Sequence, residues 1–293
     1  YGFSALLWLP LLIIAARRKT LSPGLWRAAI VPSLFNIAGQ SCFAWAPYFI
    51  KPGLMTFGMR TQILFVSVGA YLLFPSERRV LQSGVFIFAL ASVFAGAMGT
   101  MLMTPVSPDM IVAEPTPVVL GWHLSQAEAT YFGGGLAILS GALFAGYALA
   151  VRKYMHGVNP VRAFAAICQY TGVGMVVMML IMARDAGADV FKLSGDRLFL
   201  LALSAIIGIA LGHVFYYISI ARLGIALSSG IVQLQPLLVA VASTYLLRSR
   251  FEEHLKPEQW MCGFAAVIGA ILMLTVQKRV NAEANAEAAP RAT

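Results

Sequence analysis

Several polar side chains stand inside stretches that are otherwise apolar, and these residues could do chemistry. Residues 229–247 read SGIVQLQPLLVAVASTYLL, with no charge and with Gln233, Gln235 and Pro236 near the centre. Because proline has no N–H, the carbonyl of Val232 loses its helical partner and becomes a free acceptor. Amides and a free carbonyl in this setting either bind a solute or hold a neighbouring helix, and the sequence leaves both roles open.

The spacing of the two amides limits what they can do together. Gln233 and Gln235 are two residues apart, which places them about 200° apart around a helix. They therefore cannot both face one cavity. We expect one amide to line a pocket and the other to contact a neighbouring helix.

Two further stripes of polar and aromatic residues follow helical spacing. One runs along residues 27–49 and the other along residues 197–220; their members are Asn36, Gln40, Phe43 and Pro47, and His213, Tyr216 and Tyr217. Aromatic rings beside amides and an imidazole suit an organic solute that has an apolar part and a few hydrogen-bonding groups. The alternative for His213 is a simple contact between helices.

Arg60 is the one basic residue that lies well inside an apolar stretch. It stands about 10 Å below the outer end of the segment 53–74, at 1.5 Å per residue, with Thr56 and Ser67 on its face. One interpretation is that its side chain reaches out to the membrane interface. The other is a fixed cation that attracts a carboxylate or phosphate of a solute.

Acidic residues are absent from the apolar stretches. All 12 Asp and Glu residues fall in predicted loops, helix ends or the tail. Proton-coupled and sodium-coupled carriers commonly use a carboxylate inside the membrane, so we expect exchange or facilitated export instead. His213 is then the sole candidate inside a span for proton coupling, because it titrates near neutrality.

Other kinds of chemistry find no support in the sequence. Neither GxSxG nor HExxH occurs, and the 3 cysteines show no ligand spacing. We expect no enzyme activity, no metal site and no cofactor.

The amino-acid composition indicates the environment of the helices that carry these residues. Of 293 residues, 59% are apolar and 11% are charged, and the mean hydropathy is +0.79. In a soluble domain about a quarter of the residues are charged. We therefore expect the lipid bilayer to cover the surface of this protein. The net charge of +9 comes from basic residues at the ends of apolar segments, which is typical of membrane proteins. We therefore do not expect nucleic acid as a partner.

Nine apolar segments predict an all-α integral membrane bundle of nine transmembrane helices. They are residues 2–16, 27–49, 53–74, 80–103, 131–151, 163–183, 197–220, 224–247 and 259–277. When the loops alternate across the membrane, most basic residues fall on the side of the C-terminus. The positive-inside rule then predicts a multi-pass protein of the cell inner membrane with a cytoplasmic C-terminus.

The chain also contains a weak internal repeat. AYLLFPSERRVL at 70–81 resembles TYLLRSRFEEHL at 244–255 at an offset of 174, and Gln40 matches His213 at an offset of 173. Arg60-x-Gln62 matches Gln233-x-Gln235 at the same offset. By this alignment the first half lacks a partner for the span 131–151, so we expect a tenth helix before Tyr1. Five helices per half would invert the second half, as in secondary transporters.

The repeat predicts four segments. Residues 1–103 form the first repeat without its first helix, and 104–130 form an extramembrane linker. Residues 131–277 form the second repeat, and 278–293 form a disordered cytoplasmic tail. Close helix packing is expected at small residues, which are Gly208 and Gly212 in a GxxxG pattern and Gly134, Gly135, Gly141 and Gly146.

The second half resembles a repeat of the EamA type, from the drug/metabolite transporter superfamily. The resemblance lies in LGHVFYYISIARLGIALSSGIVQLQPLLVAVASTYLLRSRFEE, which includes a mid-helix proline at Pro236 and an acidic residue at Glu252 or Glu253. The first half matches less closely, with Glu77 at the acidic position and Phe65 near the proline position. The resemblance implies ten helices in two inverted repeats, a cavity between the halves, and export or exchange of small metabolites.

Taken together, these patterns predict a permease that exports or exchanges a small organic metabolite, such as an amino acid or related compound. The expected mechanism is alternating access between two inverted repeats. The alternative is a non-transporting membrane subunit that packs within a larger complex. Expected partners are the solute and the bilayer, and a homodimer or larger membrane complex is compatible with this surface.

Overall fold

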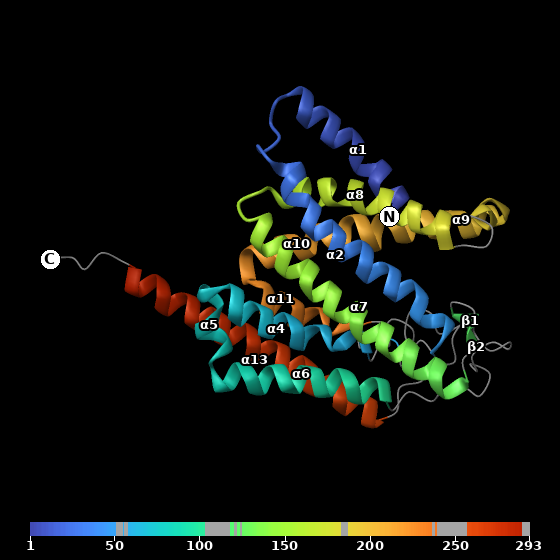
Figure 1. The fold of residues 1–293 in the computed structure, drawn as a ribbon. Helices are drawn as coiled ribbons and strands as arrows, with labels where there is room; N and C mark the ends of the chain where they lie inside the picture. Colours follow the sequence, from blue (N-terminus) through green and yellow to red (C-terminus); the bar gives the residue numbers. More distant parts are fainter. Residues whose placement is uncertain are drawn as a thin grey trace. The chain divides into compact units, whose positions relative to one another are not determined.

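A computed structural model gives the fold of this chain (Figure 1). The structure describes residues 1–50, 55, 58–102, 118–119, 122–123, 125–182, 187–235, 238 and 257–288. Helices dominate these residues, and the strands are two residues each, β1 (Val118–Val119) paired antiparallel with β2 (Trp122–His123). The predicted all-α membrane fold is confirmed.

The helices in chain order are α1 (Gly2–Arg17), α2 (Leu25–Trp45), η1 (Ala46–Tyr48), α4 (Gln62–Leu73), α5 (Pro75–Leu81), α6 (Gly84–Leu102), α7 (Gln126–Tyr154), α8 (Pro160–Met182), η2 (Ala188–Lys192), α9 (Gly195–Ser204), η3 (Ala205–Leu211), α10 (Gly212–Leu223), α11 (Ile225–Val232) and α13 (Pro257–Ala288). The element η3 is a π-helical stretch. Each of the nine predicted spans overlaps at least one of these helices.

Among the described residues, four helices are long and apolar enough to cross a membrane. They are Tyr131–Tyr154, Pro160–Ile181, Gly195–Leu223 and Trp260–Val280. Pro75–Leu81 and Gly84–Gly96, bent by 79°, make a fifth if they are counted as one span. The other segments fall short for local reasons. For example, α1 has 16 residues and α2 carries the amides of Asn36 and Gln40.

Several helices begin at residues that cap a helix N-terminus. Ser125 and Glu128 form a capping box at the start of α7, in which the Ser125 N–H donates to the Glu128 carboxylate at 2.8 Å and the Glu128 N–H donates to the Ser125 hydroxyl at 3.3 Å. Asn159 caps α8, because its Oδ1 accepts the N–H of Val161 at 3.0 Å. Pro160 follows at the first helical position, where its missing N–H costs nothing.

The chain forms two compact units. The first comprises residues Tyr1–Ala44 and Leu143–Arg222, and the second comprises Trp45–Ala142 and Leu223–Thr293. Each unit therefore combines a part of each predicted repeat. The repeats divide the chain by sequence similarity, whereas the units divide it by which residues contact each other in space.

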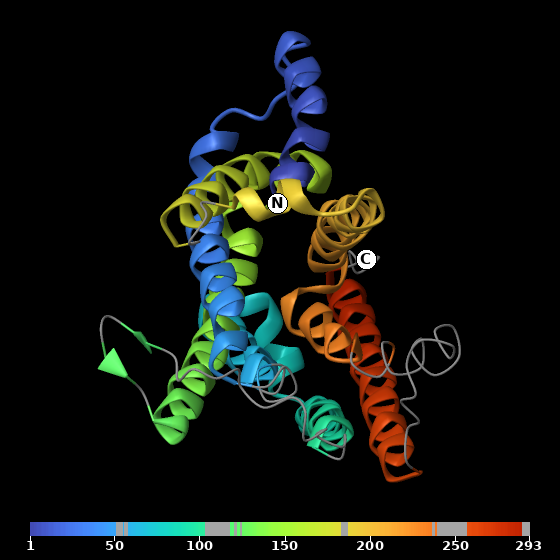
Figure 2. The ribbon, with the colours of Figure 1, turned by 90° about the vertical axis from the view of Figure 1, so that its right-hand side faces the viewer.

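In the first unit, α1 packs on α8 (Figure 2). Residues from α2, α7, α8 and α10 share one apolar core, whose largest fully buried members are Leu25, Phe164 and Ile167. Small residues allow the helices to approach, because a Cβ on Gly146 would stand 2.6 Å from the ring of Phe35. This core packs around the polar cluster at Tyr1 that is described below.

In the second unit, α6 and α13 run side by side (Figure 1). Their core includes Phe86, Val93 and Met273, all fully buried. The helix α13 continues to Ala288, so the expectation of a disordered tail from residue 278 is wrong for residues 278–288. The alanines and glutamates of this segment have high helix propensity, which lets the helix extend past its apolar part.

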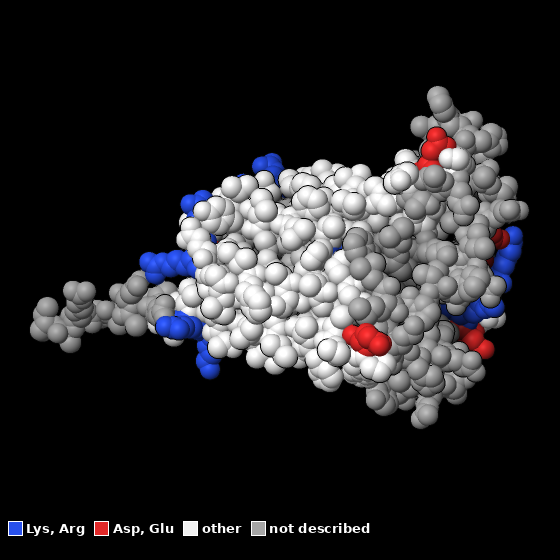
Figure 3. All heavy atoms as spheres, turned by 90° about the horizontal axis from the view of Figure 1, so that it is seen from below, with Lys and Arg blue, Asp and Glu red and all other residues white. Residues whose placement is uncertain are grey.

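The outer surface fits a lipid environment. Many large apolar side chains are exposed, and Ile181 is 74% exposed. Figure 3 shows a face on which uncharged atoms prevail and Lys and Arg side chains lie near its margins. An exposed apolar surface of this kind is stable only where lipid covers it.

Candidate functional site

The hydroxyl of Tyr1 is the centre of a polar cluster within the first unit. Gln40 donates from Nε2 to this hydroxyl at 3.0 Å, and Asn36 donates from Nδ2 at 3.3 Å. The Nε2 atom of His213 lies 3.3 Å from the same oxygen. Asn36 also donates to the Thr171 hydroxyl at 3.2 Å. Residues from four sequence regions therefore share one hydrogen-bond network.

The backbone determines which nitrogen of His213 carries its hydrogen. The Nδ1 atom lies 3.0 Å from the carbonyl oxygen of Ile209, which can only accept, so Nδ1 carries the hydrogen. In the neutral ring Nε2 is then an acceptor, and the Tyr1 hydroxyl donates to it. The same hydroxyl oxygen accepts from the two amides, and its single O–H faces two acceptors, His213 Nε2 and, at 3.4 Å, Asn36 Oδ1.

The turn before His213 is unusual. Residues Ala205–Leu211 form η3, a π-helical stretch between α9 and α10. A π-bulge adds a residue to a helical turn, changes the direction of the side chains that follow, and is frequent at functional sites. In this chain it immediately precedes α10, the helix of His213, and it includes Ile209, whose carbonyl orients the imidazole ring.

Aromatic rings enclose the imidazole. The ring of Phe164 stacks on His213 with a centroid distance of 5.1 Å and an interplanar angle of 23°. Tyr1 lies edge-on to it at 6.0 Å, and Tyr147 lies at 6.2 Å. The hydroxyls of Tyr147 and Tyr217 are hydrogen-bonded to each other. Apolar faces and polar tips thus alternate around one imidazole.

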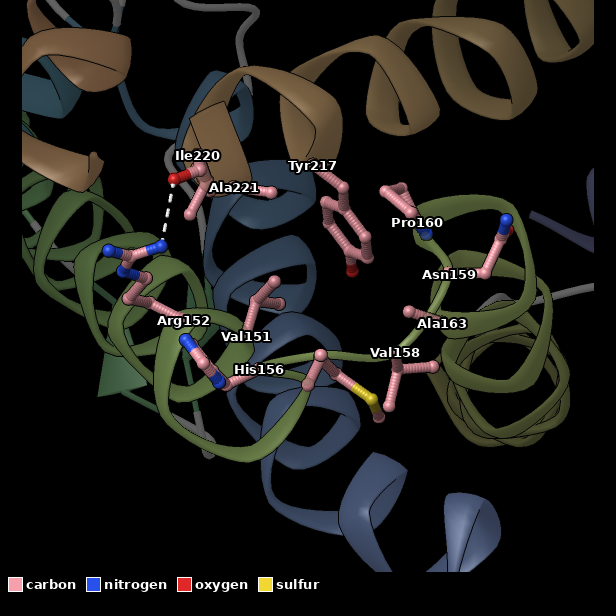
Figure 4. A pocket seen from close by; sticks show the side chains of 12 residues that line it. Val151, Arg152, His156, Val158, Asn159, Pro160, Ala163, Tyr217, Ile220 and Ala221 are labelled. Carbon is pink, nitrogen blue, oxygen red and sulfur yellow. Dashed lines mark hydrogen bonds between the residues drawn. The ribbon is translucent and has the colours of Figure 1, made fainter. Parts of the chain in front are cut away.

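A pocket of about 520 Å³ lies beside this cluster in the same unit. The segment from Val151 to Ala163 lines it together with three residues of α10, which are Tyr217, Ile220 and Ala221. Figure 4 shows Tyr217 pointing into the pocket from α10, and Arg152 donating to the Ile220 carbonyl at 3.2 Å. Tyr217 therefore belongs to the pocket lining and, through Tyr147, to the aromatic shell of His213.

A second polar contact lies within the second unit. Arg60 is 9% exposed, and its Nη1 donates to the Val232 carbonyl at 3.4 Å and to Gln233 Oε1 at 3.5 Å. Gln233 is 1% exposed and also donates to the Ser229 carbonyl at 3.5 Å, whereas Gln235 is exposed. The two amides thus face different surroundings, as their angular separation predicts. The free carbonyl expected at Val232 does have a donor, Arg60.

The structure brings some of the predicted site residues together and leaves others apart. Asn36, Gln40 and His213 meet at Tyr1, and Tyr217 reaches the same cluster through Tyr147. Tyr216 packs against the core of the first unit. Phe43 is partly buried in α2, and Pro47 falls in η1. Pro236, Thr56, Glu252 and Glu253 lie outside the described residues.

Four residues of the cluster were not predicted from the sequence, and they are Tyr1, Tyr147, Phe164 and Thr171. Phe164 and Thr171 are seven residues apart in α8, so they share a helix face, and that spacing was an available signal. Tyr1 offered no signal because its partners are 35 and 212 residues away. Among the described residues, no three His, Cys, Asp or Glu side chains group as metal ligands.

The repeat predicts two pairs of equivalent positions, and the members of each pair lie close together. Gln40 and His213 bond the same hydroxyl. Arg60 and Gln233 contact each other directly across a sequence separation of 173 residues.

Comparison with known proteins gives the fold and the family. One solved structure, a crystal structure of a protein, matches with a TM-score of 0.60 at 13% sequence identity, over 95% of this chain and 96% of that chain. At this identity the likeness concerns the fold alone. None of the curated proteins matches the chain in sequence.

The family model of the EamA-like transporter family matches residues 131–275. This match begins at the first residue of the second predicted repeat and includes Tyr147, His213 and Gln233. The resemblance to the drug/metabolite transporter superfamily is thereby confirmed, and it supports a multi-pass membrane transporter of small solutes. Residues 131–275 of the chain are similar to the EamA-like transporter family.

Proposed function

We propose that the chain exports or exchanges a small organic metabolite, such as an amino acid or related compound. The observation that carries this proposal is the meeting of Gln40, Asn36 and His213 at the Tyr1 hydroxyl. Polar groups inside apolar helices are costly, and they mark solute pathways in membrane proteins. A network of four such groups is larger than a single bond between two helices requires.

The chemistry of the cluster describes the solute. The amides, the imidazole and the Tyr1 hydroxyl offer both donors and acceptors, while Phe164, Tyr147 and Tyr217 offer apolar faces. A solute that enters would form hydrogen bonds with the groups that now bond to the Tyr1 hydroxyl. The fit is best for a molecule with an apolar part and two or three polar groups.

The proposed mechanism is alternating access between two inverted repeats. It is supported by the contacts between repeat-equivalent residues, Gln40 with His213 through Tyr1, and Arg60 with Gln233. The location that goes with this mechanism is the cell inner membrane, with the C-terminus in the cytoplasm, and it rests on the distribution of basic residues.

Reconstituted vesicles loaded with a metabolite panel test the proposal. The parent protein should release some solutes, and Gln40→Ala/His213→Ala should reduce their flux at least about tenfold, since two hydrogen bonds of about 1 kcal/mol each are lost. The matched control is Phe215→Ala, which alters a side chain of α10 that is 66% exposed. Equal flux from the parent and the double variant would remove the site. A parent without any flux would instead favour a non-transporting membrane subunit.

A further inference from the structure

Arg60 is a buried cation whose described partners are all neutral. Its residue is 9% exposed, and this burial comes from the protein alone. A side chain that reached out to the membrane interface would be exposed, so the structure disfavours that alternative. The guanidinium group remains charged in proteins, and placing it away from water without a counter-charge costs free energy.

The bonds that Arg60 makes use only a part of its hydrogen-bonding capacity. Nη1 donates at 3.4 Å to the Val232 carbonyl and at 3.5 Å to Gln233 Oε1, and both distances are at the long end for hydrogen bonds. The Nε atom is buried and has no partner among the described residues. No carboxylate of the described residues forms an ion pair with Arg60. The N–H on Nε is the donor that an incoming oxyanion would find open.

The sequence explains why the Val232 carbonyl is present at this point. Pro236 stands four residues after Val232 and has no N–H, so the carbonyl lacks its ordinary helical donor. Arg60 supplies a donor in its place. This contact is one that the guanidinium can exchange for a stronger, charge-assisted one.

A second unsatisfied group lies on the same face of the same helical segment, Gly58–Leu73. Ser67 follows Arg60 by seven residues, which is two helical turns and about 10 Å along the axis. Its hydroxyl is buried and has no hydrogen-bond partner in the described part of the chain. Serine in a helix ordinarily bonds back to a carbonyl of the preceding turn, as Ser92 does in α6 at 2.9 Å. Two orphaned donors in one line indicate a ligand that accepts hydrogen bonds.

We propose that Arg60 binds an oxyanion of the transported solute, either a carboxylate or a phosphate, through the guanidinium edge that includes Nε. This inference rests on the proposed transport function and narrows its substrate class to organic anions. Arginine presents a planar fork that matches such groups in a bidentate way. Binding supplies the counter-charge that the described protein residues do not provide.

Matched pairs of solutes test the inference in reconstituted vesicles of the full chain. Suitable probes are succinate with succinamide, benzoate with benzamide, and glycerol phosphate with glycerol. The parent should release at least one acid at least about tenfold faster than its neutral partner, the ratio that about 1.4 kcal/mol of differential binding gives. Arg60→Gln should abolish this preference, and Arg60→Lys should keep a reduced part of it. The control Arg197→Gln removes the same charge from an exposed position at the start of α9 and should behave like the parent.

Stability separates a binding role from a structural one. If Arg60 serves the solute, then Arg60→Met should fold with an unchanged or higher Tm, because an uncompensated buried charge is removed. A clear fall in the Tm of Arg60→Met together with normal acid selectivity in Arg60→Lys would assign Arg60 to the fold and overturn the inference. The Tm measurement distinguishes the two roles even where Arg60→Gln folds poorly.

The remaining outcomes are distinct. Release of neutral solutes at the rates of their acids, with Arg60→Gln like the parent, overturns the anion inference and leaves the transport proposal intact. A parent that releases nothing removes both. A lipid phosphate has the same chemistry, so vesicles of phosphatidylcholine are compared with vesicles that also contain phosphatidylglycerol. Flux that depends on phosphatidylglycerol and not on the charge of the solute would assign Arg60 to lipid and overturn the inference.

Discussion

The Glu77 carboxylate caps a helix that begins 148 residues later in the sequence: Oε1 accepts the backbone N–H of Ile225 at 2.9 Å. Oε2 accepts the N–H of Ala226 at 3.1 Å. Glu77 lies in α5 and is 6% exposed, and both N–H groups belong to the first turn of α11. The acidic position of the first repeat thus satisfies two donors that the helix itself leaves unpaired and favours the positive end of its dipole.

Replacement of Glu77 should destabilise the second unit. Glu77→Ala leaves two buried N–H groups without an acceptor and should lower the free energy of unfolding by about 1–3 kcal/mol. Glu77→Gln keeps one acceptor oxygen and should lie between Glu77→Ala and the parent. Thermal unfolding in detergent measures both. Glu258→Gln is the control, since Glu258 is an exposed acid in the first turn of α13. If Glu258→Gln lowers the free energy of unfolding as much as Glu77→Gln does, the cap by Glu77 does not stabilise the unit.

Gly224 should resist substitution because of its backbone. It has φ +87° and ψ 167° at the N-cap of α11, a region that only glycine adopts easily. A Cβ at this position would also stand 3.1 Å from Glu77 Oε1. Gly224→Ala should cost on the order of 1–3 kcal/mol. Gly84→Ala, where a Cβ meets nothing within 4 Å, should leave the Tm nearly unchanged.

Close helix packing should be most sensitive at Gly269. A Cβ there would stand 2.7 Å from the Ala89 carbonyl oxygen and 3.0 Å from the Val93 nitrogen, and backbone cannot move aside as a side chain does. Gly269→Leu should therefore lose more than about 3 kcal/mol of stability or fail to fold. Gly208→Leu should be tolerated, because a Cβ at Gly208 meets nothing within 4 Å. The reverse order in an expression and Tm comparison would contradict this assignment.

The capping box of α7 should give its first turn a dependence on pH. Because the Ser125 hydroxyl and N–H donate to the Glu128 carboxylate, the pKa of Glu128 lies below its usual range. Because the pKa of Glu128 is lower in the folded state, the cap contributes its full stability above the pKa of the unfolded state, about 4.3. This stability is lost as the pH falls through the pKa of the folded state.

Hydrogen exchange of the amides near residues 125–129, corrected for intrinsic rates, checks this prediction. Protection in the parent should decrease on acidification below about pH 4. Glu128→Gln should show weaker protection that no longer varies with pH in this range, and Ser125→Ala should resemble it. A parent whose protection stays constant down to about pH 2, well below the usual range of a glutamate, would count against the cap.

Proton coupling, if it occurs, should depend on His213. The neutral ring already uses both nitrogens, one toward Ile209 and one toward Tyr1, so adding a proton would require the Tyr1 hydroxyl to stop donating. We expect flux in vesicles to be indifferent to an imposed pH gradient. A gradient-driven flux that disappears in His213→Gln would show coupling at this residue. A gradient-driven flux that persists in His213→Gln would place the coupling elsewhere.

The positions of close packing show what a sequence pattern leaves undetermined. The GxxxG of Gly208 and Gly212 predicted a helix contact, yet in the described structure a Cβ at Gly208 meets nothing and one at Gly212 meets only the Ile207 carbonyl oxygen at 3.5 Å. Tight approaches lie elsewhere, between α6 and α13 at Gly96 and Gly269, and at Gly146, where a Cβ would stand 2.6 Å from the ring of Phe35 as the small residues of that segment predict. A spacing of four identifies a smooth helix face, but it does not say which helix will lie against that face.

Local patterns along the chain were enough to predict the membrane environment and the helical class. Apolar content and helical periodicity act within one segment, so they can be recognised without knowing the neighbours. A repeat relates distant segments directly, which is why Gln40 could be matched with His213 before any coordinate was known.

The contacts of these residues, by contrast, emerge only when the helices pack. Tyr1 as the shared hydroxyl, Glu77 as the cap of α11, and Val232 and Gln233 as partners of Arg60 all join residues that are between 35 and 212 positions apart. Such contacts depend on how helices rotate and cross, and those angles follow from the packing of whole faces. No single segment of the sequence contains that information.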